Sequence, residues 1–297
     1  MGVLASHLPA GLRLGTSSWS FPGWKGLVYE GSASAEALAR EGLSAYARHP
    51  LLRAVGLDRT FYAPLPAPEY ARYAAAVPDA FRFLVKAAQE CTFPTFPHRQ
   101  GGPSGNPRFL DAAFAREAVV APAVAGLGRK LFAVLFQFPP LGDALGDPSS
   151  FAARLARFLG ELPRGPLYSV EIRSRSLLTA AYAEALSSAG AAHAFTIHPS
   201  MPSLAAQAEA VGLDRQPALV VRWMLGHGRG YEEARQRYAP FDRLQAPDPT
   251  SRSAIAALAA TSLRLEREVL VAVNNKAEGS APLSVAALAR ELVSRRD

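Results

Sequence analysis

The sequence predicts a single-domain α/β protein, a (β/α)8 barrel of the TIM type that takes in residues 1–297. Three observations favour this fold. First, short apolar runs rich in Val, Leu, Ile and Phe alternate with Ala/Leu/Arg stretches of helical period. Second, there are eight apolar runs and eight helical stretches. Third, a chain of 297 residues has room for eight such repeats. An open doubly wound sheet is the competing arrangement, but no Gly-rich dinucleotide loop follows the first apolar run.

Each predicted strand is a short apolar run bounded by polar or turn residues. The eight strands are 12–17, 55–60, 81–86, 131–137, 168–173, 192–197, 219–223 and 269–274. Helical periodicity and starts such as Ser34 followed by Glu36 predict the elements between them. The eight helices are 34–48, 67–76, 108–125, 149–161, 176–189, 203–210, 251–264 and 284–295. Two stretches, 93–108 and 225–249, are predicted as long loops, the second of them partly helical.

The composition is that of a globular protein with a core, at 49% hydrophobic and 19% charged residues. No apolar run approaches the length of a membrane span, and the start of the chain has no signal-peptide pattern. Cys91 is the single cysteine, so an internal disulfide is excluded and a cytoplasmic location is predicted. The net charge of +7 is compatible with polyanions, but the basic residues are scattered, which favours a solvated basic surface.

Lysine usage is more informative than net charge. Of 32 basic residues, only Lys25, Lys86, Lys130 and Lys276 are lysines, and the other 28 are arginines. A lysine that persists against this bias is a candidate for a role that needs a compact, titratable ammonium.

Polar residues recur at the carboxyl ends of the predicted strands. Alternate side chains face opposite sides of a strand, so packing the bulky apolar residues outward, Phe132, Val134 and Phe136 among them, directs these polar residues inward. The inward set is Ser17, Asp58, Lys86, Gln137, Glu171, Arg173, His198, Arg222 and Asn274. Binding and catalysis in such barrels take place at this end. The pattern therefore predicts a pocket; the competing interpretations are polar residues that merely end strands, or a structural ion-pair network.

Basic members of this ring outnumber acidic ones, which favours a small anionic, phosphorylated or sugar-like ligand. The predicted catalytic residues are Glu171, as proton-transfer group, and Lys86, as electrostatic stabiliser or Schiff-base former. The predicted substrate-binding residues are Ser17, Trp19, Asp58, Tyr62, Gln137, Arg173, Arg222, Asn274 and Asn275. The enzyme class favoured is a metal-independent hydrolase or lyase; a ligand-binding scaffold without catalysis is the third alternative.

Aromatic residues are unusually dense after the first strand, where a Gly/Pro-bearing loop holds Trp19, Phe21, Trp24 and Tyr29. They either line a pocket and stack on a base or sugar, or form a satellite core beneath the loop. The first reading supports the alternative function, a nucleic-acid-binding barrel with Trp19 and Trp24 as stacking platforms on a basic surface.

Other chemistries receive little support. The six histidines, at positions 7, 49, 98, 193, 198 and 227, have no metal-ligand spacing, so neither a metal nor a cofactor is expected. No nucleophile elbow, phosphate-loop motif or kinase signature occurs. A retaining-glycosidase pair would need Asp58 and Glu171 to be near neighbours, whereas their strands are expected almost opposite one another.

The chain resembles the YecE-like family, known as domain of unknown function 72. The matching blocks cover nearly the whole chain in order, and they include Gly15–Ser20, Trp24–Gly26, Tyr29, Thr60–Tyr62, Phe81–Lys86, Gln137–Pro140, Glu171–Arg173, Arg222 and Asn274-Asn275. The resemblance implies a TIM-type barrel and no particular reaction, since the family's biochemical role is not established.

The chain also departs from the family pattern. Gly56 and Asp58 stand where the family usually has Glu-x-Asn, and Phe93 replaces an expected His. The segment 174–177 reads SRSL instead of His-x-Ser-Trp, and the Arg-x-His-Gly block is altered within 222–228. Any acid–base or metal role of those positions in relatives is therefore not expected here.

Overall fold

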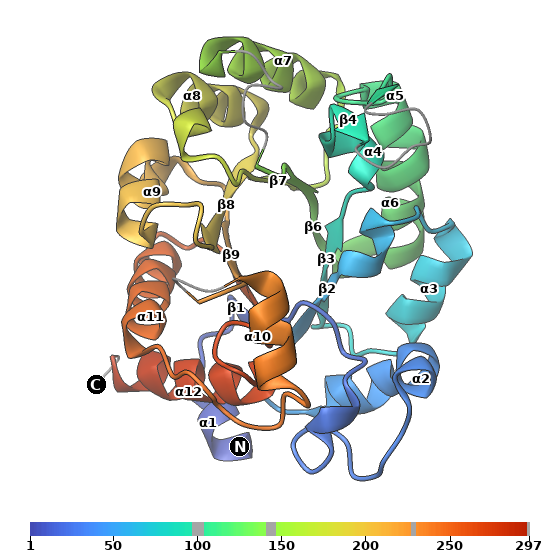
Figure 1. Ribbon diagram of the computed structural model, residues 1–297, viewed down its shortest axis with the longest axis vertical. Coiled ribbons are helices and arrows are strands. Elements are labelled where there is room, and N and C mark those ends of the chain that lie inside the picture. The colour runs from blue at the N-terminus through green and yellow to red at the C-terminus, as the bar shows by residue number, and fades with distance from the viewer. Residues whose placement is uncertain (97–103, 141–146, 227–229, 296–297) are drawn as a thin grey trace.

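The computed structural model describes residues 1–96, 104–140, 147–226 and 230–295, and their strands form the predicted closed parallel barrel. Figure 1 looks onto the barrel, with the strands at the centre and most helices around them. The strand order around the barrel is β1-β10-β9-β8-β7-β6-β3-β2. Its strands are β1 (Leu12–Thr16), β2 (Ala54–Leu57), β3 (Arg82–Lys86), β6 (Leu131–Gln137), β7 (Tyr168–Glu171), β8 (Ala192–Ile197), β9 (Leu219–Trp223) and β10 (Val269–Val273).

The predicted helices form the outer layer of the barrel (Figure 1). They are α2 (Ala35–Arg48), α3 (Ala67–Ala75), α6 (Ala121–Leu127), α7 (Pro148–Glu161), α8 (Ala180–Ala189), α9 (Leu204–Val211), α11 (Pro249–Arg264) and α12 (Ala281–Ser294). The stretch predicted as one helix over 108–125 begins as α5 (Ala112–Ala115) and passes through a π-helical turn, Arg116–Val120, before α6. None of the helices in the described ranges has the length and apolar character needed to cross a membrane.

The two predicted loops carry short elements of their own. Residues 93–108 contain β4 (Thr95–Phe96) paired antiparallel with β5 (Ser104–Gly105), and residues 97–103 between them lie outside the described part. The second loop contains α10 (Tyr231–Tyr238), which agrees with its predicted helical character. The described residues also contain two further short α-helices, α1 (Gly2–Ser6) and α4 (Gln89–Thr92), and α1 contacts α12.

Strand parity separates an outer core from a small inner core, as predicted. Outward residues such as Val55, Val134 and Val271 pack against the helices, while small and aliphatic side chains fill the barrel. The prediction that Phe132 faces outward was wrong, because this side chain belongs to the inner cluster and not to the outer one. The pairing between β3 and β6 shifts by one residue after Phe83, and a shift of one residue moves a side chain to the other face.

A glycine in α6 permits close contact with α3, and its replacement is expected to destabilise the barrel. A Cβ at Gly126 would lie 2.4 Å from both the Ala67 carbonyl oxygen and the Tyr70 Cβ. Gly126→Ala should therefore lower the free energy of unfolding by about 1–3 kcal/mol, measured by urea denaturation. The matched control is Gly160→Ala in α7, where an added Cβ meets nothing within 4 Å. The control should be neutral or stabilising by about 0.5–1 kcal/mol, and equal effects of the two changes would contradict this account.

Candidate functional site

A cavity of about 370 Å³ opens at the carboxyl ends of the strands, and we refer to it as the mouth cavity. Every barrel strand, or the residues directly after it, contributes to its lining. The predicted site residues that line it are Ser17, Asp58, Tyr62, Lys86, Gln137, Arg173, Arg222 and Asn274. His198 and Lys276 add polar groups, and its less polar wall is formed by Phe21, Met224, Leu225 and Tyr231, the last from α10.

A buried ion-pair network forms the floor of this site. Arg222, 1% exposed, donates from Nη1 to Glu171 Oε2 at 2.6 Å and from Nη2 to the two Asp58 oxygens at 3.0 and 3.1 Å. Arg173 Nε donates to the other Glu171 oxygen at 2.8 Å, and Thr196 Oγ1 approaches the same oxygen at 3.4 Å. Asp58 and Glu171, predicted on nearly opposite strands, are thus joined through one guanidinium. Both carboxylates are therefore engaged by the same guanidinium, which does not fit the free carboxylate pair of a retaining glycosidase.

Glu171 is held in its ionised form. Burial alone would raise its pKa, but the charges of Arg222 and Arg173 and their hydrogen bonds outweigh burial and lower the pKa from 4.5 to about 2. Both of its oxygens are also occupied by donors. Efficient proton transfer needs a pKa near the working pH, so this geometry suits Glu171 to fixing two arginines better than to the proton transfer predicted for it.

Lys86 is the opposite case, a cation without a carboxylate partner. Burial lowers the pKa of Lys86 to about 8, with Asp58 opposing the shift and Arg222 adding to it. Its Nζ lies 3.6 Å from the centre of the Phe61 ring. No carboxylate of the described residues lies within 4.0 Å of that ammonium. The end of β3 that carries Lys86 is fixed by Thr60, whose hydroxyl donates to the Lys86 carbonyl.

The turn after β10 brings Asn274 and Lys276 to the mouth cavity. Asn274 faces the cavity: its Nδ2 donates to Ser17 Oγ at 2.9 Å, and its Oδ1 accepts from the Lys276 backbone N–H at 3.0 Å. The Lys276 ammonium lies 3.5 Å from the same Oδ1 and 4.1 Å from the centre of the Tyr231 ring. Lys276 was not among the predicted site residues, although the fact that it is one of only four lysines could have identified it.

Two predicted binding residues lie away from the mouth cavity. Asn275 is 1% exposed, and its Oδ1 accepts from Trp24 Nε1 at 3.2 Å and from the first N–H of α12 at 2.8 Å. Trp19 is 4% exposed and donates its indole N–H to the Leu38 carbonyl at 2.9 Å. Asn275 points away because it is one residue past the inward Asn274, and Trp19 packs edge-on against Tyr73 as part of the core.

Three aromatic residues of the loop after β1 are buried in the main hydrophobic core, not in a separate satellite core, and the fourth, Phe21, lines the mouth cavity. Trp24 is fully buried, and Trp19 and Tyr29 belong to the same core cluster. Trp19 and Trp24, the predicted stacking platforms for a nucleic acid, therefore have no accessible ring face in this structure. Tyr62, 75% exposed at the rim, is the remaining accessible aromatic among the predicted site residues.

The histidines described show no arrangement for a metal. Burial and the Arg173 charge lower the pKa of His198 to about 4, so this ring at the cavity wall is neutral at neutral pH. His193 is enclosed between Tyr182 and Gln207. Among the described residues no group of three or more His, Cys, Asp or Glu side chains could hold a metal ion, and His98 and His227 lie outside them. The expectation of a site without metal or cofactor stays a prediction.

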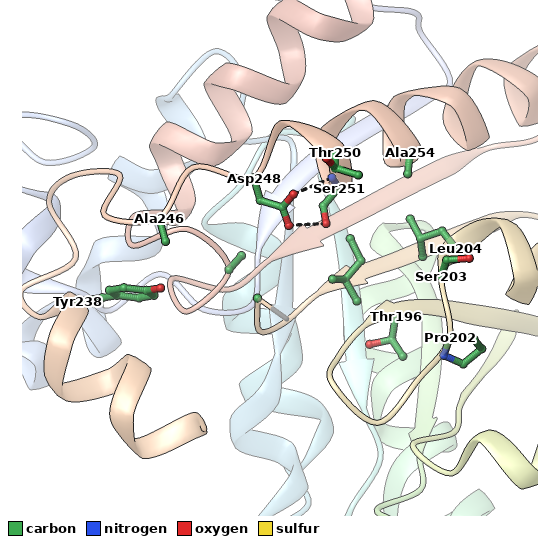
Figure 2. A pocket seen from close by; sticks show the side chains of 13 residues that line it. Thr196, Pro202, Ser203, Leu204, Tyr238, Ala246, Asp248, Thr250, Ser251 and Ala254 are labelled. Atoms are coloured by element: carbon green, nitrogen blue, oxygen red, sulfur yellow. Dashed lines mark hydrogen bonds between the residues drawn. The ribbon is translucent and has the colours of Figure 1, made fainter. Parts of the chain in front are cut away.

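A second cavity, of about 430 Å³, lies between the start of α9 and the start of α11 (Figure 2). Its most polar group, Asp248, accepts hydrogen bonds from the Ser251 backbone and hydroxyl and so caps α11. No Lys, Arg or His is among the described residues that line it. This cavity is somewhat larger, but the converging charges and free donors are in the mouth cavity.

Comparison with known proteins finds a family match over nearly the whole chain. The family described as "Protein of unknown function DUF72" matches residues 13–297. A UPF0759 protein of Bacillus subtilis, YunF, is 31% identical over 140 residues, which is 46% of this chain and 44% of that protein. The chain thus aligns with less than half the length of this curated relative.

Two solved structures are similar over nearly their full lengths. A DUF72 family protein from Enterococcus faecalis superposes with a TM-score of 0.63 at 22% identity, covering 95% of each chain. A DUF72 family protein from Thermotoga maritima superposes with a TM-score of 0.61 at 17% identity, covering 96% of this chain and 98% of that one. At these identities the likeness establishes the fold alone.

Proposed function

This chain belongs to the DUF72 family, whose description names no reaction, and we propose from its geometry that it binds and acts on a small anionic molecule in the mouth cavity. One observation carries the proposal. Two ammonium groups, Lys86 and Lys276, face the same cavity, and neither has a carboxylate of the described residues within 4.0 Å. Charges that the protein does not neutralise favour an anionic ligand.

The surrounding groups strengthen this preference. Lys86, Arg173, Arg222 and Lys276 supply four positive charges against the two negative charges of Asp58 and Glu171. Arg173 uses Nε for Glu171, which leaves the terminal guanidinium nitrogens without a hydrogen bond inside the described residues. A planar guanidinium with free nitrogens is suited to a carboxylate or phosphate.

We assign the residues roles on this basis. Arg173 and Lys276 bind the anionic group, while Gln137, Asn274 and Ser17 orient the rest of the ligand. Glu171 acts as a positioning residue, because its two oxygens hold Arg222 and Arg173 in place. Proton transfer passes to Lys86, whose lowered pKa of about 8 is closer to neutral pH.

Inorganic phosphate and pyruvate, titrated calorimetrically at constant ionic strength, test this proposal. Lys276→Met should weaken binding of both anions by roughly 10- to 100-fold, because it removes a charge-assisted contact worth about 1.5–3 kcal/mol. Lys25→Met is the matched control, since Lys25 is exposed and does not line the cavity. The affinity of Lys25→Met for either anion should stay within about twofold of the affinity of the unmodified protein. Equal affinities for all three proteins, or no binding of either anion, would refute the proposed site.

A further inference from the structure

We propose that Lys86 forms an imine with its substrate, so that the mouth cavity accepts small anionic aldehydes or ketones, compounds that carry a carboxylate or phosphate beside a reactive carbonyl. This inference rests on the proposed function, because it uses the same cavity and the same anion-binding residues. It adds the chemical class of the substrate and the covalent step.

The placement of the lysines is the first argument. This chain uses arginine 28 times and lysine four times, yet two of the four lysines line one cavity. Lys130 has a structural role, since its ammonium donates to the Ala74 and Val77 carbonyls at 2.8 and 2.7 Å. An arginine would serve electrostatics equally well in the cavity, whereas only a lysine offers a primary amine.

The second argument is that the surroundings of Lys86 suit a nucleophilic amine. Its nitrogen has neither a hydrogen bond nor an ion pair within the described residues, and Phe61 covers one side of it. Asp58, the nearby acidic group at the cavity, is engaged by both of its oxygens with Arg222. The lowered pKa of Lys86, about 8, leaves roughly 9% of it as neutral amine at pH 7, against roughly 0.03% at the ordinary value of 10.5.

Lys276 is the less suitable of the two lysines for this step. Its ammonium lies 3.5 Å from Asn274 Oδ1 and 4.1 and 6.0 Å from the centres of the Tyr231 and Phe241 rings. The Lys276 ammonium thus already has an oxygen acceptor in Asn274, whereas Lys86 Nζ has no hydrogen-bond acceptor among the described residues. Lys276 and Arg173 therefore hold the anionic group of the substrate, while Lys86 meets its carbonyl carbon.

The step balances without any further reactant. The lone pair of the Lys86 amine attacks the carbonyl carbon, a C–N bond forms, and the C=O π pair moves to oxygen, which takes up a proton as the nitrogen releases one. The C–O bond then breaks with uptake of a second proton, water leaves, and a protonated imine results. Overall, an amine, a carbonyl compound and one proton give a protonated imine and water. A protonated imine withdraws electrons from a neighbouring bond, which fits the lyase side of the predicted enzyme class.

Reductive trapping tests the inference on the full chain. The protein is incubated with pyruvate at about pH 7, reduced with borohydride and mapped by peptide mass spectrometry. Because its pKa is lowered to about 8, Lys86 has a larger fraction of neutral amine at pH 7 than an ordinary lysine. We therefore expect the adduct on Lys86 to exceed that on Lys25 or Lys130 at least about tenfold, after allowing for the lower nucleophilicity of a less basic amine. Uniform labelling of the lysines would overturn the inference.

Two controls separate the imine from the anion site. Acetone, which has a carbonyl but no charge, should label Lys86 at least about tenfold less than pyruvate, and equal labelling would overturn the anionic substrate class. Lys86→Arg keeps the positive charge but not the amine, so the adduct should disappear, and an adduct of unchanged yield would overturn its assignment to Lys86. Phosphate binding without any adduct would refute the imine alone. If the unmodified protein does not bind phosphate, the proposed function is refuted.

A pH profile gives a readout that a structural role of Lys86 would not produce. The rate of adduct formation in the unmodified protein should rise with an inflection near pH 8, and phosphate should compete with pyruvate and slow it. This competition needs no variant, so the inference stays testable even if Lys86→Arg does not fold. A rate that still rises steeply through about pH 10, as for an ordinary lysine, would contradict it.

Discussion

Replacing Arg222 with methionine is expected to lower the free energy of unfolding by about 3–5 kcal/mol, which is a large part of the stability of a typical domain. Arg222 is 1% exposed and binds Glu171 and Asp58 through separate nitrogens. Methionine keeps most of the volume but leaves Asp58 and Glu171 without the partner they share. A buried charge that loses its partner keeps its desolvation cost, and the two like charges also repel.

The matched control for Arg222→Met is Arg116→Met, which breaks an ion pair of similar length at the surface. Arg116 Nη2 lies 3.1 Å from a Glu117 oxygen, and the two side chains are 49% and 73% exposed. Exposed pairs contribute little, so this variant should cost less than about 1 kcal/mol. Urea denaturation at neutral pH compares the two. Similar costs for Arg222→Met and Arg116→Met would show that the floor of the mouth cavity does not depend on its central guanidinium.

Strand parity accounts for most of what could be predicted from the sequence. It requires only that bulky residues face the helices, and this alone directs Lys86, Gln137, Arg222 and Asn274 toward one end of the barrel. It fails at Phe132, where a shift in the pairing of β3 with β6 changes the face. Such a shift depends on how two strands fit together and leaves no local mark in either sequence.

Residues beyond the strand ends were harder to predict because parity stops where the strand stops. Lys276 lies three residues after Val273 and reaches the cavity through a turn in which its own N–H bonds to Asn274. Trp19 follows β1 by three residues and turns into the core instead. Nothing in the order of residues distinguishes these two cases, since the difference lies in which tertiary partners each side chain meets. A structural ion-pair network was one of the interpretations of the polar ring, but parity could not show that a single long arginine would join Asp58 and Glu171 across the separation between their strands.

Glu171→Gln is expected to destabilise the protein by about 3 kcal/mol at neutral pH, and by progressively less as the pH falls. The folded-state pKa of Glu171 is about 2 and its ordinary value is 4.5. Since the folded value is the lower one, ionised Glu171 stabilises the fold above about pH 4.5, and this contribution is lost as the pH falls toward about 2. Each unit of pKa difference corresponds to about 1.4 kcal/mol, which gives the magnitude. Glu171 is fully buried, so solvent does not screen the interaction.

Urea denaturation from about pH 7 down to about pH 3 measures this effect as the difference between the unmodified protein and Glu171→Gln. Other carboxylates that respond to acid are present in both proteins, so the difference isolates the contribution of Glu171. Glu161→Gln, at the exposed end of α7, gives the cost of removing a surface carboxylate, expected within about 0.5 kcal/mol at neutral pH. A difference that does not change with pH would mean that Glu171 stabilises the barrel by its shape and hydrogen bonds alone. The electrostatic attraction that holds Arg222 and Arg173 toward the mouth cavity would then have to come from a group other than Glu171.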